Sequence, residues 1–116
     1  MKIIIAGSRN FTDYPKLKKE CDPFLQDQKN IEIVSGCHYK GADNLGIQYA
    51  NENDFNLIKF PADWNKFGKA AGPKRNKEMA IFSDALIAFW DGKSRGTKNM
   101  IKFAKQKGLI VKVVLF

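Results

Sequence analysis

The feature that most constrains this chain is a series of five short apolar runs separated by segments with helical spacing. The runs cover residues 2–6, 31–35, 56–60, 85–90 and 110–115. Most are continuously apolar and rich in isoleucine and valine, which is typical of strands covered on both faces of a sheet. The runs therefore predict five buried parallel strands.

The segments between the runs repeat apolar residues at helical spacing. In the first, Leu17, Cys21 and Phe24 follow Asp13, a good N-cap, and Pro23 predicts a kink or an end of that helix. The later segments place apolar residues on one face in the same way: Leu45, Tyr49 and Ala50 after Asp43, Met79 and Phe82 after Pro73, and Met100, Phe103 and Ala104 before Gly108. We expect residues 61–72 to form a long irregular loop.

Regular alternation of strand and helix predicts an α/β fold. We expect a Rossmann-like three-layer sandwich with a five-stranded parallel sheet in the order 3-2-1-4-5, formed by residues 1–116 as one domain. The first strand begins directly after Met1, which leaves no room for a signal peptide. No apolar run approaches the roughly 18 residues of a membrane span. The expected location is therefore cytoplasmic, with no membrane partner.

The two cysteines and one histidine do not form a metal-binding pattern. Cys21 and Cys37 are not in a CxxC pair, and His38 alone is too little for a usual zinc site. We expect two reduced thiols, no metal and no cofactor, with Cys37 close enough to a strand end to line a site.

The formal net charge of +8 favours anionic partners. Only three of the twenty basic residues are arginines, and each of them, Arg9, Arg75 and Arg95, lies in a loop marked by glycine or proline. A planar guanidinium pairs with phosphate or carboxylate through two hydrogen bonds. The arginines therefore point to an anionic ligand more directly than the scattered lysines do.

Glycine-rich loops follow the predicted strands. Ligands of open α/β sheets bind outside the carboxyl ends of the strands, where glycine lets a phosphate approach the backbone and a helix start offers N–H groups. The loop 91–97 has this order of strand, glycine and helix start, although it is neither a GxGxxG fingerprint nor a P-loop. Trp64 is the better candidate for stacking on a base, because Trp90 ends a buried strand. The predicted ligand-binding residues are Gly7, Ser8, Arg9, Gly36, Gly41, Ala42, Asp43, Trp64, Arg75, Asn76, Asp91, Gly92, Ser94, Arg95, Gly96 and Thr97.

These loops also resemble a known family. The similarity runs in order along nearly the whole chain, through residues 6–9, 35–36, 41–43, 61–64, 71–76 with Met79, 83–89, and 92–97 with Met100. The chain resembles the SLOG superfamily, the Rossmann-like group of Smf/DprA and LOG proteins, and most closely its small stand-alone YspA-like members. The resemblance implies binding of nucleotides or nucleotide-derived signals at the strand ends. It also implies a homodimer or higher homo-oligomer, with the loop from Trp64 to Phe67 as part of the contact.

The LOG branch contains phosphoribohydrolases, and only part of their motif carries over. Their arginine corresponds to Arg75 and their glycine-threonine pair to Gly96 and Thr97, but Asn99 and Met100 occupy the stretch of the catalytic glutamate. No catalytic residue is therefore assigned, and an enzyme is the less favoured interpretation.

Three functions stay open at this point. The first is a protein that binds, senses or sequesters a small nucleotide-like signalling molecule. The second is an N-glycosidase or phosphoribohydrolase that uses Asp43 or Asp91 with Arg75. The third is nucleic-acid binding, which is suggested by the net charge and by distant similarity to DprA. It is less favoured, because Lys98, Lys102 and Lys105 resemble an ordinary solvated helix face.

Overall fold

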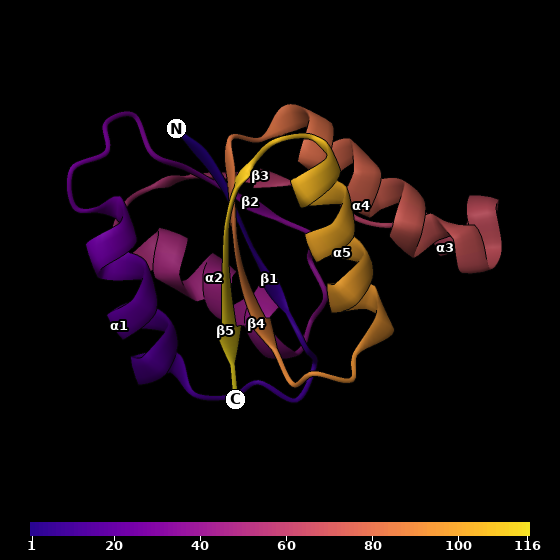
Figure 1. Ribbon diagram of the computed structural model, residues 1–116, viewed down its shortest axis with the longest axis horizontal. Coiled ribbons are helices and arrows are strands. Elements are labelled where there is room, and N and C mark those ends of the chain that lie inside the picture. Colours follow the sequence, from indigo (N-terminus) through magenta and orange to yellow (C-terminus); the bar gives the residue numbers. More distant parts are fainter.

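The computed structural model describes residues 1–116 and contains one twisted parallel sheet between two helical layers (Figure 1). All neighbouring strands pair in parallel, in the order β3-β2-β1-β4-β5. The strands are β1 (Lys2–Gly7), β2 (Glu32–Ser35), β3 (Asn56–Lys59), β4 (Ala85–Trp90) and β5 (Ile110–Leu115). The predicted fold class and strand order are therefore confirmed.

The helices divide between the two faces of the sheet (Figure 1). They are α1 (Tyr14–Leu25), α2 (Gly41–Glu52), α3 (Trp64–Phe67), the 3₁₀ turn η1 (Gly68–Ala70), α4 (Ala71–Phe82) and α5 (Arg95–Gln106). Helices α1 and α2 cover one face, and α4 and α5 cover the other. No helix is both long and apolar enough to cross a membrane.

The central strand β1 supplies side chains to both cores. Ile3 and Ile5 are fully buried against α1 and α2, whereas Ile4 is fully buried with the apolar residues of α4 and α5. Successive side chains of a strand point to opposite faces, so a strand covered on both sides must be apolar throughout. This geometry explains why the runs in the sequence are continuous rather than alternating.

Helix α1 begins as its sequence predicts and ends slightly later than its proline suggests. The Asp13 side chain accepts a hydrogen bond from the Lys16 amide at 3.1 Å. The helix continues past Pro23 to Leu25, and Leu25, rather than the half-buried Phe24, is the buried residue of the last turn. Pro23 has no N–H to continue the backbone hydrogen bonding, and α1 ends two residues after it.

The prediction of an irregular loop over 61–72 was wrong. Asp63 caps α3 by accepting from the Lys66 amide at 3.1 Å, and η1 then leads directly into α4. The Trp64 ring packs beside Gly72, where an added Cβ would lie 3.2 Å from the ring. Local capping and this aromatic contact order a segment whose sequence has no helical repeat.

Candidate functional site

A cleft of about 740 Å³ opens at the carboxyl ends of β1, β2 and β4. Its wall also includes α3, the first half of α4 and the start of α5. Most of the predicted ligand-binding residues line it: Gly7, Arg9, Gly36, Asp43, Trp64, Arg75, Asn76, Ser94, Arg95, Gly96 and Thr97. The parallel sheet thus brings together loops that are far apart in the sequence.

The other predicted residues do not line this cleft. Ser8 is buried, and its hydroxyl accepts a hydrogen bond from the Asp91 amide at 3.2 Å, which ties the β1 and β4 loops together. Ala42 is buried, and Gly41 lies so close to the Ser8 carbonyl that an added Cβ would stand 2.3 Å from it. Asp91 and Gly92 lie outside the lining as well. These residues shape the loops that carry the wall of the cleft.

The cleft contains all three arginines of the chain and none of its lysines. Arg9 and Arg95 are exposed at its edge, whereas Arg75 is half-buried. Asp43 is the one acidic residue in the lining. The charged side chains of the cleft therefore give it a net positive charge and favour an anionic ligand.

Arg75 is held by backbone and side-chain acceptors. Its Nη1 donates to the Gly36 carbonyl and, at 3.4 Å, to the Phe60 carbonyl, and its Nε donates to Asn76 Oδ1 at 3.0 Å. A Cβ on Gly36 would lie 2.5 Å from Nη1, so the guanidinium reaches this position only because residue 36 is glycine. Burial lowers the pKa of Arg75, with the charge of Asp43 opposing the shift, yet a guanidinium remains protonated at neutral pH.

The dipole of α4 does not account for the position of Arg75. Arg75 is the fifth residue of α4 rather than part of its first turn, where the dipole acts most strongly. The anionic group whose charge acts on it within the protein is Asp43. The position of Arg75 is therefore explained by its hydrogen bonds to Gly36, Phe60 and Asn76 and by the charge of Asp43.

Asp43 is a buried carboxylic acid and not the N-cap of α2. Lys40 holds the N-cap position, and Asp43 lies in the first turn with 7% of its surface exposed. Its Oδ2 accepts a hydrogen bond from the His38 amide at 3.2 Å. Burial raises the pKa of Asp43, although the His38 amide and the Arg75 charge act in the opposite direction. Asp43 is therefore a group of the cleft that can hold a proton.

The loop before α5 satisfies much of its own hydrogen bonding. Asp91 Oδ1 accepts from the Ser94 amide at 2.8 Å and the Lys93 amide at 2.9 Å, which together lower the pKa of Asp91. Ser94 caps α5 by accepting from the Thr97 amide at 3.4 Å, and the two hydroxyls lie 3.1 Å apart. The amides of Arg95 and Gly96, in the first turn, have no acceptor in the protein. The donors open to an anion are thus fewer than the whole loop 92–97 suggested.

Cys37 lies in the lining, as its place near a strand end suggested, whereas His38, Tyr39 and Asn99 are polar or aromatic residues of the cleft that the sequence did not predict. Cys37, His38 and Tyr39 follow Gly36, and the rings of His38 and Tyr39 stack with centroids 4.9 Å apart. Asn99 accepts a hydrogen bond from Asn76 Nδ2 at 3.0 Å. Asn99 lies one helical turn after Gly96, a spacing that could have identified it. His38 and Tyr39 have no such spacing, and only the fold brings them to the cleft.

The two tryptophans have different roles. Trp64 lines the cleft and is 53% exposed, so its ring is open to a ligand. Trp90 is half-buried at the end of β4, and its indole N–H donates to the Ser94 carbonyl at 3.0 Å. Trp90 therefore supports the loop before α5 from outside the cleft.

The fold and the cleft define a Rossmann-like α/β protein with a positively charged cleft at the carboxyl ends of its strands. Comparison with known proteins agrees with this class. The model of the YspA, cpYpsA-related SLOG family matches residues 1–67, and the chain belongs to this family. The resemblance seen in the sequence is therefore confirmed, and the family indicates a role in binding or modifying nucleotide-related molecules.

Two relatives come from phage genomes. The chain is 30% identical to the gene 61 protein of Mycobacterium phage D29, over 95% of this chain and 93% of that protein. It is 28% identical to the uncharacterised SPbeta prophage-derived protein YoqJ of Bacillus subtilis (strain 168), over 72% of this chain and 50% of YoqJ. The chain thus spans about half the length of YoqJ. No solved structure gives a significant match.

Proposed function

We propose that this protein binds a small nucleotide or nucleotide-derived signalling molecule in the cleft. The observation that carries the proposal is that all three arginines of the chain, and none of its lysines, line this one cleft. Arginine presents a rigid fork of donors that matches the oxygens of a phosphate. A random distribution of basic side chains on a surface with seventeen lysines does not account for this selection.

The cleft offers complementary groups for the other parts of a nucleotide. The unpaired amides of Arg95 and Gly96 lie at the start of α5, where the helix dipole also favours a phosphate. Trp64 and Tyr39 supply exposed rings on the lining, and aromatic rings stack on bases. We infer that the phosphate lies toward α5, within reach of Arg9 and Arg75, and that the base lies toward the aromatic side chains.

The first test is the chemical identity of the molecule that co-purifies with the protein. Mass spectrometry after heat release should detect an intact phosphorylated nucleoside derivative. Calorimetric titration should then give tighter binding for a nucleoside 5′-monophosphate than for the same nucleoside. Equal affinity for the two compounds, or no binding of either with no co-purified nucleotide, would contradict the proposal.

Variants of the cleft test the placement of the phosphate. Arg75→Ala should weaken binding about tenfold to a hundredfold, because a charge-assisted contact contributes roughly 1.5–3 kcal/mol. Arg75→Lys should recover only part of the loss, since the planar fork is absent. Thr97→Ala should cost less than Arg75→Ala. Wild-type affinity in all three variants would place the anion elsewhere.

A second candidate is hydrolysis of an N-glycosidic bond, and the position of Asp43 favours it. Asp43 is the single acid of the lining, is buried, and holds a proton more readily than an exposed aspartate. It could protonate the leaving base while water adds to the sugar carbon, giving free base and ribose phosphate, and the proton released by the water would restore the acid. Asp91 is less suited, since its carboxylate already binds two amides of its own loop.

Product analysis separates the two candidates. Chromatography of a nucleotide after incubation should show no change for a binding protein, and free base plus ribose phosphate for a hydrolase. Asp43→Asn keeps an oxygen for the His38 amide, so it should bind the nucleotide but not cleave it. Cleavage by Asp43→Asn at the wild-type rate would exclude Asp43 as the acid.

We also propose sequestration of the ligand by a homodimer or higher homo-oligomer. The support is the family resemblance and the exposed ring of Trp64 on α3, beside the cleft. Light scattering at micromolar concentration should give at least twice the monomer mass of 13.2 kDa. A monomer mass would contradict this part of the proposal and leave the ligand site unaffected.

A further inference from the structure

The positive charge of this protein lies almost entirely in one half of the chain. Residues 1–63 contain eight basic and nine acidic side chains, whereas residues 64–116 contain twelve basic and three acidic ones. The two halves also lie on different faces of the sheet: α1 and α2 of the first half cover one face, and α4 and α5 of the second half cover the other (Figure 1). One face of the molecule is therefore strongly basic.

The most regular part of this face is the outer surface of α5. Arg95, Lys98, Lys102 and Lys105 repeat at intervals of three or four residues, so they lie in a row along one side of the helix. The helix contains no acidic residue. Over ten residues the row is about 15 Å long, at a rise of about 1.5 Å per residue. All four cations are exposed along this side of α5.

No acidic group of the protein neutralises this row. The two ion pairs of the structure join Lys74 to Glu78 and Lys112 to Glu20, and neither includes a residue of α5. Like charges on successive turns repel one another and reduce helix stability slightly. A row of unpaired lysines is thus better explained by an external anion than by the stability of α5.

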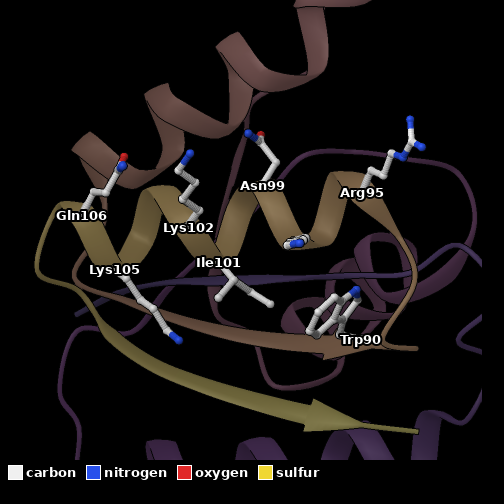
Figure 2. A pocket seen from close by; sticks show the side chains of 8 residues that line it. Trp90, Arg95, Asn99, Ile101, Lys102, Lys105 and Gln106 are labelled. Carbon is white, nitrogen blue, oxygen red and sulfur yellow. The ribbon is translucent and has the colours of Figure 1, made fainter.

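A shallow groove of about 590 Å³ runs beside the row (Figure 2). Trp90 and Ile101 lie on the sheet side of α5, and the Lys102 and Lys105 side chains point away from each other, toward α4 and toward the strands respectively (Figure 2). Arg95 and Asn99 line both this groove and the nucleotide cleft. The basic row therefore leads directly to the edge of the cleft.

We propose that the α5 row binds the phosphate backbone of a nucleic acid, without preference for its base sequence. The evenly spaced cations match an anion that repeats along a line, and DNA carries a negative charge about every 1.7 Å of its axis. Lysine binds phosphate as a point charge, which positions a backbone but does not read bases. A second copy of this chain is a poor partner for the α5 row, because its less basic half, residues 1–63, has a nearly balanced charge.

The test is fluorescence anisotropy with a labelled single strand of roughly 25 nucleotides and the corresponding duplex, titrated at several salt concentrations. One variant replaces Lys98, Lys102 and Lys105 by Gln. The matched control replaces Lys18, Lys19 and Lys29, all exposed in the other half of the chain, by Gln. Both variants lose three positive charges, so they differ only in where the charge is removed. Unfolding midpoints check that both variants are folded.

The wild type should bind at least one probe, with affinity that falls steeply as salt rises. The α5 variant should lose most of that affinity at about 50 mM salt, and its slope of log K against log salt should fall by about 2–3. The control should stay within about threefold of the wild type. Stronger binding of one probe identifies whether a single strand or a duplex is preferred.

Three results would overturn the proposal. Binding of neither probe at low salt would exclude a nucleic-acid surface. Equal losses in the two variants would show that net charge alone, rather than the α5 row, attracts the probe. Binding to vesicles of anionic phospholipid that depends on the α5 lysines, without binding to either probe, would assign the row to a membrane surface. None of these results affects the nucleotide cleft, which is tested by other residues.

Discussion

Gly96 provides the sharpest test of where the phosphate binds. It is the one glycine of the chain whose φ is not positive and at which an added Cβ would meet nothing within 4 Å. It is also the second residue of α5, where alanine is the better helix former. The protein alone thus gives no reason for glycine at this position, whereas a phosphate approaching the Gly96 amide does.

Gly96→Ala should therefore separate stability from binding. Alanine stabilises a helix by about 0.5–1 kcal/mol relative to glycine, and we take about 0.5 kcal/mol because the position is in the first turn. With an unfolding entropy of about 2.1 cal/mol/K per residue, this gain raises the Tm by about 2 °C. The new methyl group should hinder the phosphate and weaken nucleotide binding about tenfold to a hundredfold, the value of one charge-assisted hydrogen bond.

Thermal unfolding and calorimetric titration with a nucleoside 5′-monophosphate measure the two effects. Asn44→Ala is the matched control, because Asn44 is exposed on α2, away from the cleft, and the change raises helix propensity by a similar amount. The control should gain stability and bind normally. If Gly96→Ala also binds like the wild type, the phosphate does not lie against the start of α5, and our reasoning on this glycine is wrong.

Three further predictions concern Gly36, Asp43 and Cys37, which line the cleft. Gly36→Ala should destabilise the protein by about 1–3 kcal/mol in urea unfolding and also weaken nucleotide binding, because its Cβ displaces Arg75; unchanged stability would contradict the close contact. Burial raises the pKa of Asp43, so the folded state binds the Asp43 proton more tightly than the unfolded state. The stability that this contributes should be present at low pH and be lost as pH rises from about 3.8 through the raised pKa. Over that pH range the urea midpoint of Asp43→Asn should therefore decline less than the midpoint of the wild type. Iodoacetamide should modify the half-buried Cys37 of the folded protein, more slowly with nucleotide bound, and should spare Cys21, whose pKa burial raises to about 12. Mass spectrometry of the digested protein measures both reactions, and an unmodified Cys37 in the folded protein would contradict an open cleft.

The sequence determined the architecture because its signals are local. Continuous apolar runs such as the one containing Ile4 and Ile5 can be buried only in a sheet covered on both faces, and strand-helix alternation makes that sheet parallel. Parallel strands bring their carboxyl ends to one edge, so the glycine-rich loops with Arg9 and Arg95 were predictable members of a single site.

Only the tertiary structure decided which polar groups of those loops remain open to a ligand. The Lys93 and Ser94 amides bind the Asp91 carboxylate, whereas the Gly96 amide has no acceptor, and nothing in the loop sequence distinguishes them. The same is true of Arg75, whose guanidinium reaches a carbonyl 39 residues away in the chain. A hydrogen bond depends on distances of a few tenths of an ångström, and in this site those distances are set by the packing of separate segments around the sheet.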